Sequence, residues 1–126
     1  MVRAFYAALA AGKLDAALAL LATDVRWNDP KGFPYGGALT SPAQVRRQVF
    51  EAIGAEWPSF GITPERFIEG KDGRSVVVIG RYTGTHGASR RSLDVAFAHV
   101  WSTADGAITS FFTHTDTAEL RAAMAV

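Results

Sequence analysis

The stretch "SLDVAFAHVWSTADGAITSFFTHT", residues 92–115, determines the class of fold. Large side chains alternate with mostly smaller ones from Leu93 to Ser102, and Ile, Phe and Thr dominate from Ala107 to Thr115. Both patterns are typical of β-strands. The intervening "ADG" has the composition of a tight turn, so the stretch predicts two antiparallel neighbours.

Two further strands are predicted just before this pair. Arg66 to Glu69 and Ser75 to Thr83 are rich in Val, Ile, Phe and Tyr, and the segments "GKDGR" and "GTHGASR" supply turn residues between the strands. The second half of the chain is therefore predicted to form an antiparallel meander.

The first half of the chain has helical periodicity. Apolar residues over 2–9 recur at helical spacing, and Gly12 is suited to the backbone that follows a helix end. The same spacing over 14–21 predicts a second short helix that ends near Asp24. The two helices are expected to form a hairpin.

Two more helices have start signals in the sequence. Ser41 as N-cap, Pro42 at the first helical position and Gln44 as the other half of a capping box predict a third helix, which Gly54 is expected to end. A short last helix is predicted from Asp116 to Ala125.

Helices followed by consecutive antiparallel strands predict an α+β fold with the helices on one face of a curved sheet. If the sheet wraps around the helices, it forms a cone whose open end is a cavity lined by alternate strand residues. The 126 residues are expected to form one domain, 1–126.

Composition narrows the classes of function. The chain has no cysteine, a net charge of +1 and no apolar run long enough to cross a bilayer. Its basic doublets are isolated, which is unlike a nucleic-acid-binding surface. These features predict a cytoplasmic protein that binds neither nucleic acid nor membrane. Because nucleotide-binding motifs and closely paired histidines are missing, we expect no cofactor and no metal.

The segment "RWNDPKGFPYGG", residues 26–37, contains the first catalytic candidate, Asp29. An Asp before a Pro can simply cap its own turn. However, Trp27, Phe33 and Tyr35 lie close in sequence, and a carboxylate desolvated by aromatic rings has a raised pKa, as a general base requires. Both interpretations remain open from the residues alone.

Three other titratable side chains are candidates. His99 has bulky apolar neighbours on its strand face, which fits either a hydrogen-bonded core residue or a proton donor in the cavity. By parity, His114 and Asp116 share a strand face with Phe112 and are predicted to form a coupled pair. Asp116 also has Glu119 three residues later, which is a capping box for the last helix.

The predicted cavity wall is aromatic. A hydrophobic ligand is expected to contact Tyr6, Trp27, Phe33, Tyr35, Phe50, Trp57, Phe97, Trp101 and Phe112.

The whole pattern resembles the nuclear transport factor 2-like superfamily, and within it the SnoaL-like and ketosteroid isomerase-related proteins. The resemblance rests on the helix-Gly-helix start, "DVRWNDPKGFPYGG", the capped third helix and "ADGAITSFFTHTD" before the last helix. It implies a cone-shaped fold, a homodimer through the exposed sheet face and cofactor-free proton transfer. Asp29 matches the general base of the isomerases, and Asp116 matches the acid/base carboxylate of SnoaL-like cyclases.

The chain departs from the isomerase pattern at both oxyanion donors. The position of the isomerase tyrosine is Phe5, with Tyr6 one residue along, and the position of the second aspartate is Phe97. Replacement donors are expected among His99, His114 and Tyr35.

The sequence therefore predicts a cofactor-free enzyme of the isomerase, cyclase or hydratase kind that performs acid/base chemistry on a small hydrophobic carbonyl compound. The alternative is a protein without catalytic activity, either a module that binds a hydrophobic ligand or a dimerisation scaffold. The missing donors at Phe5 and Phe97 favour this alternative.

Overall fold

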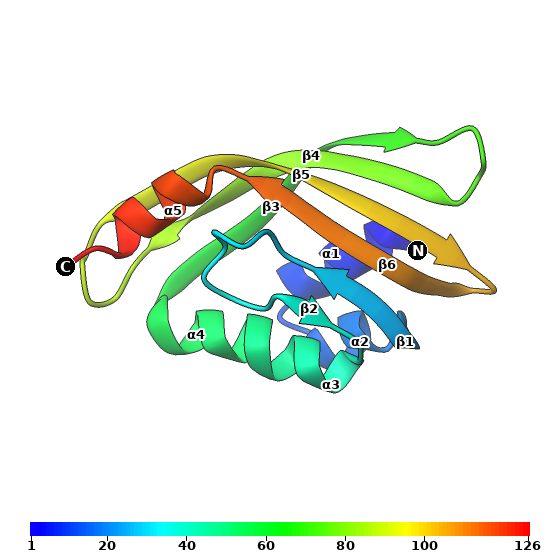
Figure 1. Cartoon of the computed structure of the whole chain (residues 1–126), viewed down its shortest axis with the longest axis horizontal. Coiled ribbons are helices and arrows are strands. Elements are labelled where there is room, and N and C mark those ends of the chain that lie inside the picture. The colour runs from blue at the N-terminus through cyan, green and yellow to red at the C-terminus, as the bar shows by residue number, and fades with distance from the viewer.

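A curved six-stranded sheet packs over helices in the computed structural model, which describes all residues 1–126 (Figure 1). No helix is both long enough and apolar enough to span a membrane. The elements, in chain order, are α1 (Val2–Ala10), α2 (Leu14–Leu18), β1 (Leu21–Asn28), β2 (Ala38–Leu39), α3 (Pro42–Val45), the π-helical segment η1 (Arg46–Glu51), α4 (Ala52–Glu56), β3 (Ser59–Glu69), β4 (Ser75–Thr85), β5 (Ser92–Ala104), β6 (Ala107–Thr115) and α5 (Thr117–Met124).

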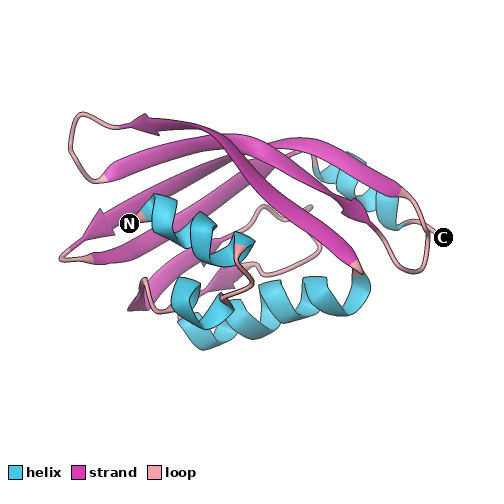
Figure 2. Ribbon diagram, turned by 180° about the vertical axis from the view of Figure 1, so that it is seen from behind, coloured by secondary structure: helices cyan, strands magenta, loops and turns pink.

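The strand order is β2-β1-β6-β5-β4-β3. Strands β3 to β6 pair antiparallel with their chain neighbours, which confirms the predicted meander. Strand β1 joins the sheet by parallel pairing with β6. Helices α1 to α4 lie against one face of the sheet, and α5 lies at one end (Figure 2). The predicted α+β fold is confirmed.

The hydrophobic core fills the space between this sheet face and the helices. Phe5, Val45, Trp101 and Ile108 are among its most deeply buried side chains. On β5, Leu93, Val95, Phe97, His99 and Trp101 all point into the core, as the alternation predicted.

Two predicted helix boundaries are wrong. The second helix ends at Leu18 rather than near Asp24, because Leu21 already pairs with Ile108 in the sheet. The helix capped by Ser41 continues past Gly54 to Glu56, where the Trp57 N–H bonds to the Ile53 carbonyl and the buried Trp57 ring anchors the end. The predicted N-cap itself is confirmed, since Ser41 Oγ accepts from the Gln44 N–H at 3.2 Å.

A β-bulge changes which residues of β6 face the core. Ser110 pairs with Ser102, but Ile108 pairs with the next residue, Thr103, so Thr109 is an extra residue on β6. The alternation shifts by one residue at this point. Phe111 and Thr113 therefore face the core, together with Ile108.

Candidate active site

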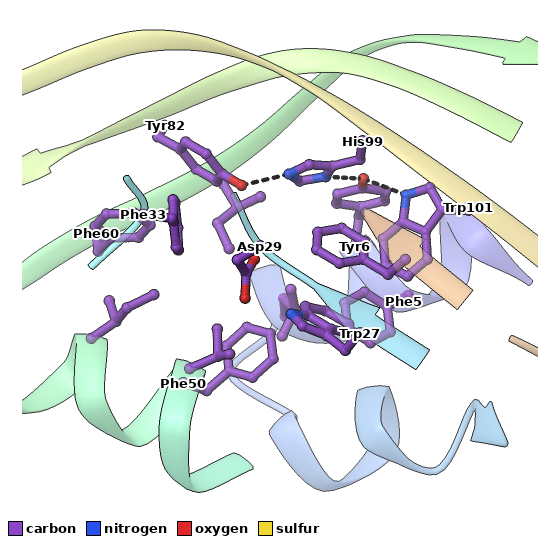
Figure 3. Close-up of a pocket in the computed structure, with 15 residues that line it drawn as sticks. Phe5, Tyr6, Trp27, Asp29, Phe33, Phe50, Phe60, Tyr82, His99 and Trp101 are labelled. Atoms are coloured by element: carbon purple, nitrogen blue, oxygen red, sulfur yellow. Dashed lines mark hydrogen bonds between the residues drawn. The ribbon is translucent and has the colours of Figure 1, made fainter. Parts of the chain in front are cut away.

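A narrow pocket lies between the inner face of the sheet, α1 and the η1–α4 helix (Figure 3). Asp29 is its only carboxylate, His99 is its only histidine, and most other lining groups are aromatic or aliphatic. The lining residues are Phe5, Tyr6, Leu9, Trp27, Asp29, Phe33, Val49, Phe50, Ile53, Phe60, Ile62, Tyr82, His99, Trp101 and Phe111.

An open groove gives access to this pocket. The pocket has only about 30 Å³ of room for the centre of a water-sized molecule, whereas the groove beside it has about 530 Å³ by the same measure. Pocket and groove share Leu9, Phe50, Ile53, Phe60 and Ile62. A ligand larger than water can reach Asp29 only if side chains at this shared boundary move.

The loop after β1 turns the Asp29 carboxylate into the pocket. Pro30 ends the strand, and the Asp29 N–H bonds to the Gly37 carbonyl at 3.0 Å. In return, the Gly37 N–H donates to Asp29 Oδ2 at 3.3 Å. The carboxylate lies directly over Gly36, where an added Cβ would be 2.0 Å from Oδ2. The side chain therefore bonds across the loop to a residue eight positions away instead of capping its own turn.

Desolvation dominates the electrostatics of Asp29. Burial raises the pKa of this carboxyl to about 7, and the Gly37 N–H and the Trp27 indole offset only part of that effect. Trp27 Nε1 is buried without a hydrogen-bond partner of good geometry. Its N–H therefore lies close enough to Asp29 to lower that pKa but forms no well-aligned hydrogen bond with the carboxylate.

A chain of hydrogen bonds crosses the wall of the pocket opposite Asp29 (Figure 3). Trp101 Nε1 donates to Tyr6 Oη at 2.8 Å, and Tyr6 Oη bonds to His99 Nδ1 at 2.6 Å. His99 Nε2 bonds to Tyr82 Oη at 2.6 Å, and Tyr82 Oη bonds to Thr113 Oγ1 at 2.9 Å. Burial, followed by the charge of His114, lowers the pKa of His99 well below its usual value, so the ring is neutral.

Tyr82 is the functional candidate that sequence reasoning missed. The strand pattern around Val76, Val78 and Tyr82 fits either face of the sheet, and only the pairing of Val78 with His99 places Tyr82 inside. Gly80 is a sequence signal that could have identified the inner face of this strand. A Cβ there would lie 2.5 Å from the Phe97 ring, so the glycine marks the crowded, inner face of β4.

Most of the predicted wall residues line the pocket, but three buried ones do not. Tyr6, Trp27, Phe33, Phe50 and Trp101 are in the lining. Phe97 lies behind it, with its ring stacked on His99 at 3.7 Å. Trp57 lines the groove instead and donates through Nε1 to Tyr35 Oη at 2.8 Å, outside the pocket.

The predicted positions of three residues on or after β6 are wrong. Because of the bulge at Thr109, Phe112 and His114 are exposed on the outer face of the sheet, where their rings stack at 4.6 Å. Asp116 is exposed at the N-cap of α5, and its Oδ1 accepts from the Glu119 N–H at 3.1 Å. The predicted His114–Asp116 pair therefore does not reach the pocket.

The sequence matches the family model of the SnoaL-like domain over residues 2–111. This chain belongs to the SnoaL-like family. The SnoaL-like chain is also similar to an NTF2-like protein from Burkholderia thailandensis, with 31% sequence identity and a TM-score of 0.94, over 99% of this chain and 95% of that chain. None of the curated proteins matches significantly.

Two more distant structures share the NTF2-like fold of this SnoaL-like chain. TerC, crystallised with polyporic acid, is 23% identical with a TM-score of 0.85 over 98% of this chain and 94% of that chain. A Xanthomonas campestris protein proposed to be a polyketide cyclase is 19% identical with a TM-score of 0.80 over 98% of this chain and 93% of that chain. At these identities the similarity establishes the fold.

Proposed function

We propose that this SnoaL-like protein is a cofactor-free enzyme that transfers protons on a hydrophobic carbonyl compound, with Asp29 as general base. The observation that supports the proposal is the position of one carboxylate in an otherwise apolar, aromatic pocket. A base with a pKa of about 7 is ionised in part at neutral pH and still binds a proton well.

In the proposed reaction, the Asp29 carboxylate removes a proton from the carbon next to the carbonyl group. The electrons of the C–H bond move into the carbonyl and form an enolate, whose oxygen needs a hydrogen-bond donor. In an isomerisation, Asp29 then returns the proton to another carbon of a conjugated enolate. In a cyclisation, the enolate carbon attacks a second carbonyl, and the proton held by Asp29 goes to the alkoxide oxygen that forms there. The Tyr82 hydroxyl faces the same pocket and is the proposed donor. It would replace the oxyanion donors that the isomerases have at the positions of Phe5 and Phe97.

The structural neighbours are compatible with this chemistry. Proteins with this fold include the one from Xanthomonas campestris and one from Pseudomonas putida that is also proposed to be a polyketide cyclase.

Proton exchange on a simple ketone tests the proposal. With 2-tetralone in deuterated water, the native protein is expected to accelerate exchange at the carbon next to the carbonyl, and Asp29→Asn is expected to lower the rate by about 10²- to 10⁴-fold. Asp24→Asn makes the same chemical change at an exposed position of β1 and should leave the rate unchanged. Equal rates for Asp29→Asn and the native protein would exclude Asp29 as the base.

The narrow pocket favours a second candidate, a module that binds a hydrophobic ligand without reaction. Its free space is small and its lining is mostly apolar. Under this alternative, 2-tetralone binds but its protons exchange no faster than in buffer.

A further inference from the structure

We propose that Trp101, Tyr6, His99 and Tyr82 form a one-way chain of hydrogen-bond donors that ends with the Tyr82 hydroxyl hydrogen pointing at an acceptor oxygen of the ligand. The chain makes Tyr82 a catalytic residue and Tyr6 a positioning residue. The part of the inference that concerns the ligand rests on the proposed function, and the direction of the chain does not.

The direction begins at Trp101, because an indole N–H can only donate. Its hydrogen goes to Tyr6 Oη at 2.8 Å. The Tyr6 hydroxyl has one other partner, His99 Nδ1 at 2.6 Å. The Tyr6 and Tyr82 side chains are both buried, so each hydroxyl hydrogen needs an acceptor in the protein or in a bound ligand.

The two tautomers of His99 differ in which tyrosine hydrogen is left without a partner. A neutral imidazole has one N–H and one unprotonated nitrogen, and both nitrogens are hydrogen-bonded here. If Nδ1 carried the hydrogen, Tyr6 Oη would accept from both Trp101 and His99, and the Tyr6 hydrogen would have no acceptor. If Nε2 carries it, Tyr6 donates to Nδ1 and His99 donates to Tyr82. Each arrangement thus leaves one tyrosine hydrogen without a partner, on Tyr6 in the first and on Tyr82 in the second. We infer the second arrangement, because the charge of Asp29 acts on the Tyr82 hydroxyl and attracts its hydrogen.

The same reasoning applies at Tyr82. Its oxygen accepts from His99 Nε2 and also bonds to Thr113 Oγ1 at 2.9 Å. Thr113 is fully buried, and Tyr82 is the one partner of its hydroxyl, so Thr113 must donate to be satisfied. Tyr82 Oη thus accepts two hydrogen bonds, and its own hydrogen has no partner in the protein.

The Tyr82 side chain lines the same pocket as Asp29 (Figure 3), so its free hydrogen can point at a molecule bound there. Burial raises the pKa of the Tyr82 hydroxyl, so the group keeps its hydrogen and acts as a donor. Two accepted hydrogen bonds polarise the O–H and strengthen the third bond that it donates. The ligand is therefore expected to place an acceptor, such as a carbonyl or enolate oxygen, against Tyr82.

The tautomer of His99 can be measured without any ligand. Two-bond ¹H–¹⁵N spectra of protein labelled with ¹⁵N-histidine should show His99 with a protonated Nε2 and an unprotonated Nδ1 between pH 5 and pH 9. Signals of the other histidines are identified by their loss in His86→Gln and His114→Gln. A protonated Nδ1, or titration of His99 in this range, would overturn the proposal.

Two Tyr→Phe variants test the positioning role. In Tyr6→Phe, the His99 Nδ1 resonance should move to higher frequency, because the nitrogen no longer accepts a hydrogen bond from the Tyr6 hydroxyl. Tyr35→Phe is the matched control, since the Tyr35 hydroxyl bonds to Trp57 and not to the chain, and it should leave the resonance in place. Identical His99 spectra in Tyr6→Phe and the native protein would contradict the assignment. If Tyr6→Phe does not fold, the tautomer of His99 measured in the native protein alone tests the direction of the chain.

The ligand contact is tested by the infrared carbonyl stretch of bound, ¹³C-labelled 2-tetralone. The native protein should lower this frequency relative to an apolar solvent, Tyr82→Phe should abolish the shift, and Tyr6→Phe should reduce it. An unchanged shift in Tyr82→Phe would overturn the proposal. If the shift behaves as expected while Asp29→Asn exchanges protons as fast as the native protein, the hydrogen-bond chain is supported and the proposed reaction is not.

Discussion

At the scale of single residues, the burial of Asp29 makes a base and also lowers stability. Folding raises the pKa of this carboxyl from 3.8 to about 7. Between these two values, the unfolded chain loses the proton and the folded chain keeps it, so the free energy of unfolding falls as pH rises and levels off above about 7. The stability that Asp29 contributes is therefore greatest at low pH.

Asp29→Asn should accordingly stabilise the protein at alkaline pH. Because the amide cannot ionise, the variant avoids the desolvation cost, and its free energy of unfolding at pH 8 should exceed that of the native protein by on the order of 4 kcal/mol. The gain should shrink toward zero by about pH 4. Urea unfolding at several pH values measures it, and a destabilised Asp29→Asn at pH 8 would contradict the assigned environment.

Gly36 offers a second test at this scale. Its φ of 82° suits glycine, and a Cβ would collide with the Asp29 carboxylate. Gly36→Ala should push the carboxylate out of place and lower the exchange rate of 2-tetralone by about 10²-fold. Gly12→Ala has comparable backbone strain, with a φ of 72°, but no atom within 4 Å of its Cβ and no contact with Asp29. If both variants lose activity equally, backbone strain and not the position of Asp29 is responsible.

The sequence indicated that Asp29 lies among aromatic rings, but it did not indicate that Tyr82 faces the pocket, and the difference has a physical reason. Aromatic residues that neighbour Asp29 in the sequence indicate that its carboxylate is desolvated, and this signal is local in the chain. The position of Tyr82 depends on its partners on other strands, His99 and Thr113, which lie 17 and 31 residues away. Alternation of side chains along a strand divides its residues between two faces, but it does not show which face is turned toward the core.

At the scale of elements, helix α5 holds the loop that carries Asp29. Arg121 Nε donates to the Gly32 carbonyl at 2.6 Å. Gly32 itself packs against Thr117, with no room for a Cβ. The last helix thereby fixes the segment between Pro30 and Gly36, although it contributes no side chain to the pocket lining.

Arg121→Ala should loosen this loop. Loss of the hydrogen bond is expected to cost about 1 kcal/mol, and kcat/KM for proton exchange should fall by about fivefold. Arg47→Ala removes the same charge from an exposed position on η1 and serves as the control. Unchanged kinetics in Arg121→Ala, together with a normal melting temperature, would show that α5 does not position the loop.

The limits of sequence prediction also differ between elements. Strands β4 to β6 were predicted closely because alternation and turn residues are local properties of the chain. The bulge at Thr109 and the parallel pairing of β1 with β6 arise from contacts between distant segments. Because of this bulge, Phe112 and His114 lie on the outer face of the sheet and not in the pocket, where they were predicted.

At the scale of the whole molecule, the outer face of the sheet has an apolar row. Ile68, Val77, Val100 and Phe112 lie on successive strands in direct register. Ile68, Val100 and Phe112 are among the most exposed large hydrophobic side chains of the chain. Such a row is suited to packing against the same row of a second copy.

We therefore expect a homodimer through this face. Sedimentation at micromolar concentration should give twice the monomer mass of 13.5 kDa. Val100→Lys should place a charge in the row and weaken association by at least about tenfold, whereas Ala55→Lys adds the same charge on exposed α4 and should not. A monomer at that concentration, or a dimer that tolerates Val100→Lys, would exclude this interface.

Proton transfer by Asp29 requires a carboxyl that is shielded from water, and the ionisation of this carboxyl is the most direct test. The protein is labelled with ¹³C-aspartate, the Asp29 Cγ signal is identified by its loss in Asp29→Asn, and its chemical shift is followed from pH 3 to pH 9. A midpoint near 7 is the predicted result. A midpoint near 4, the value of an exposed aspartate, would contradict the dry pocket and the proposed base together.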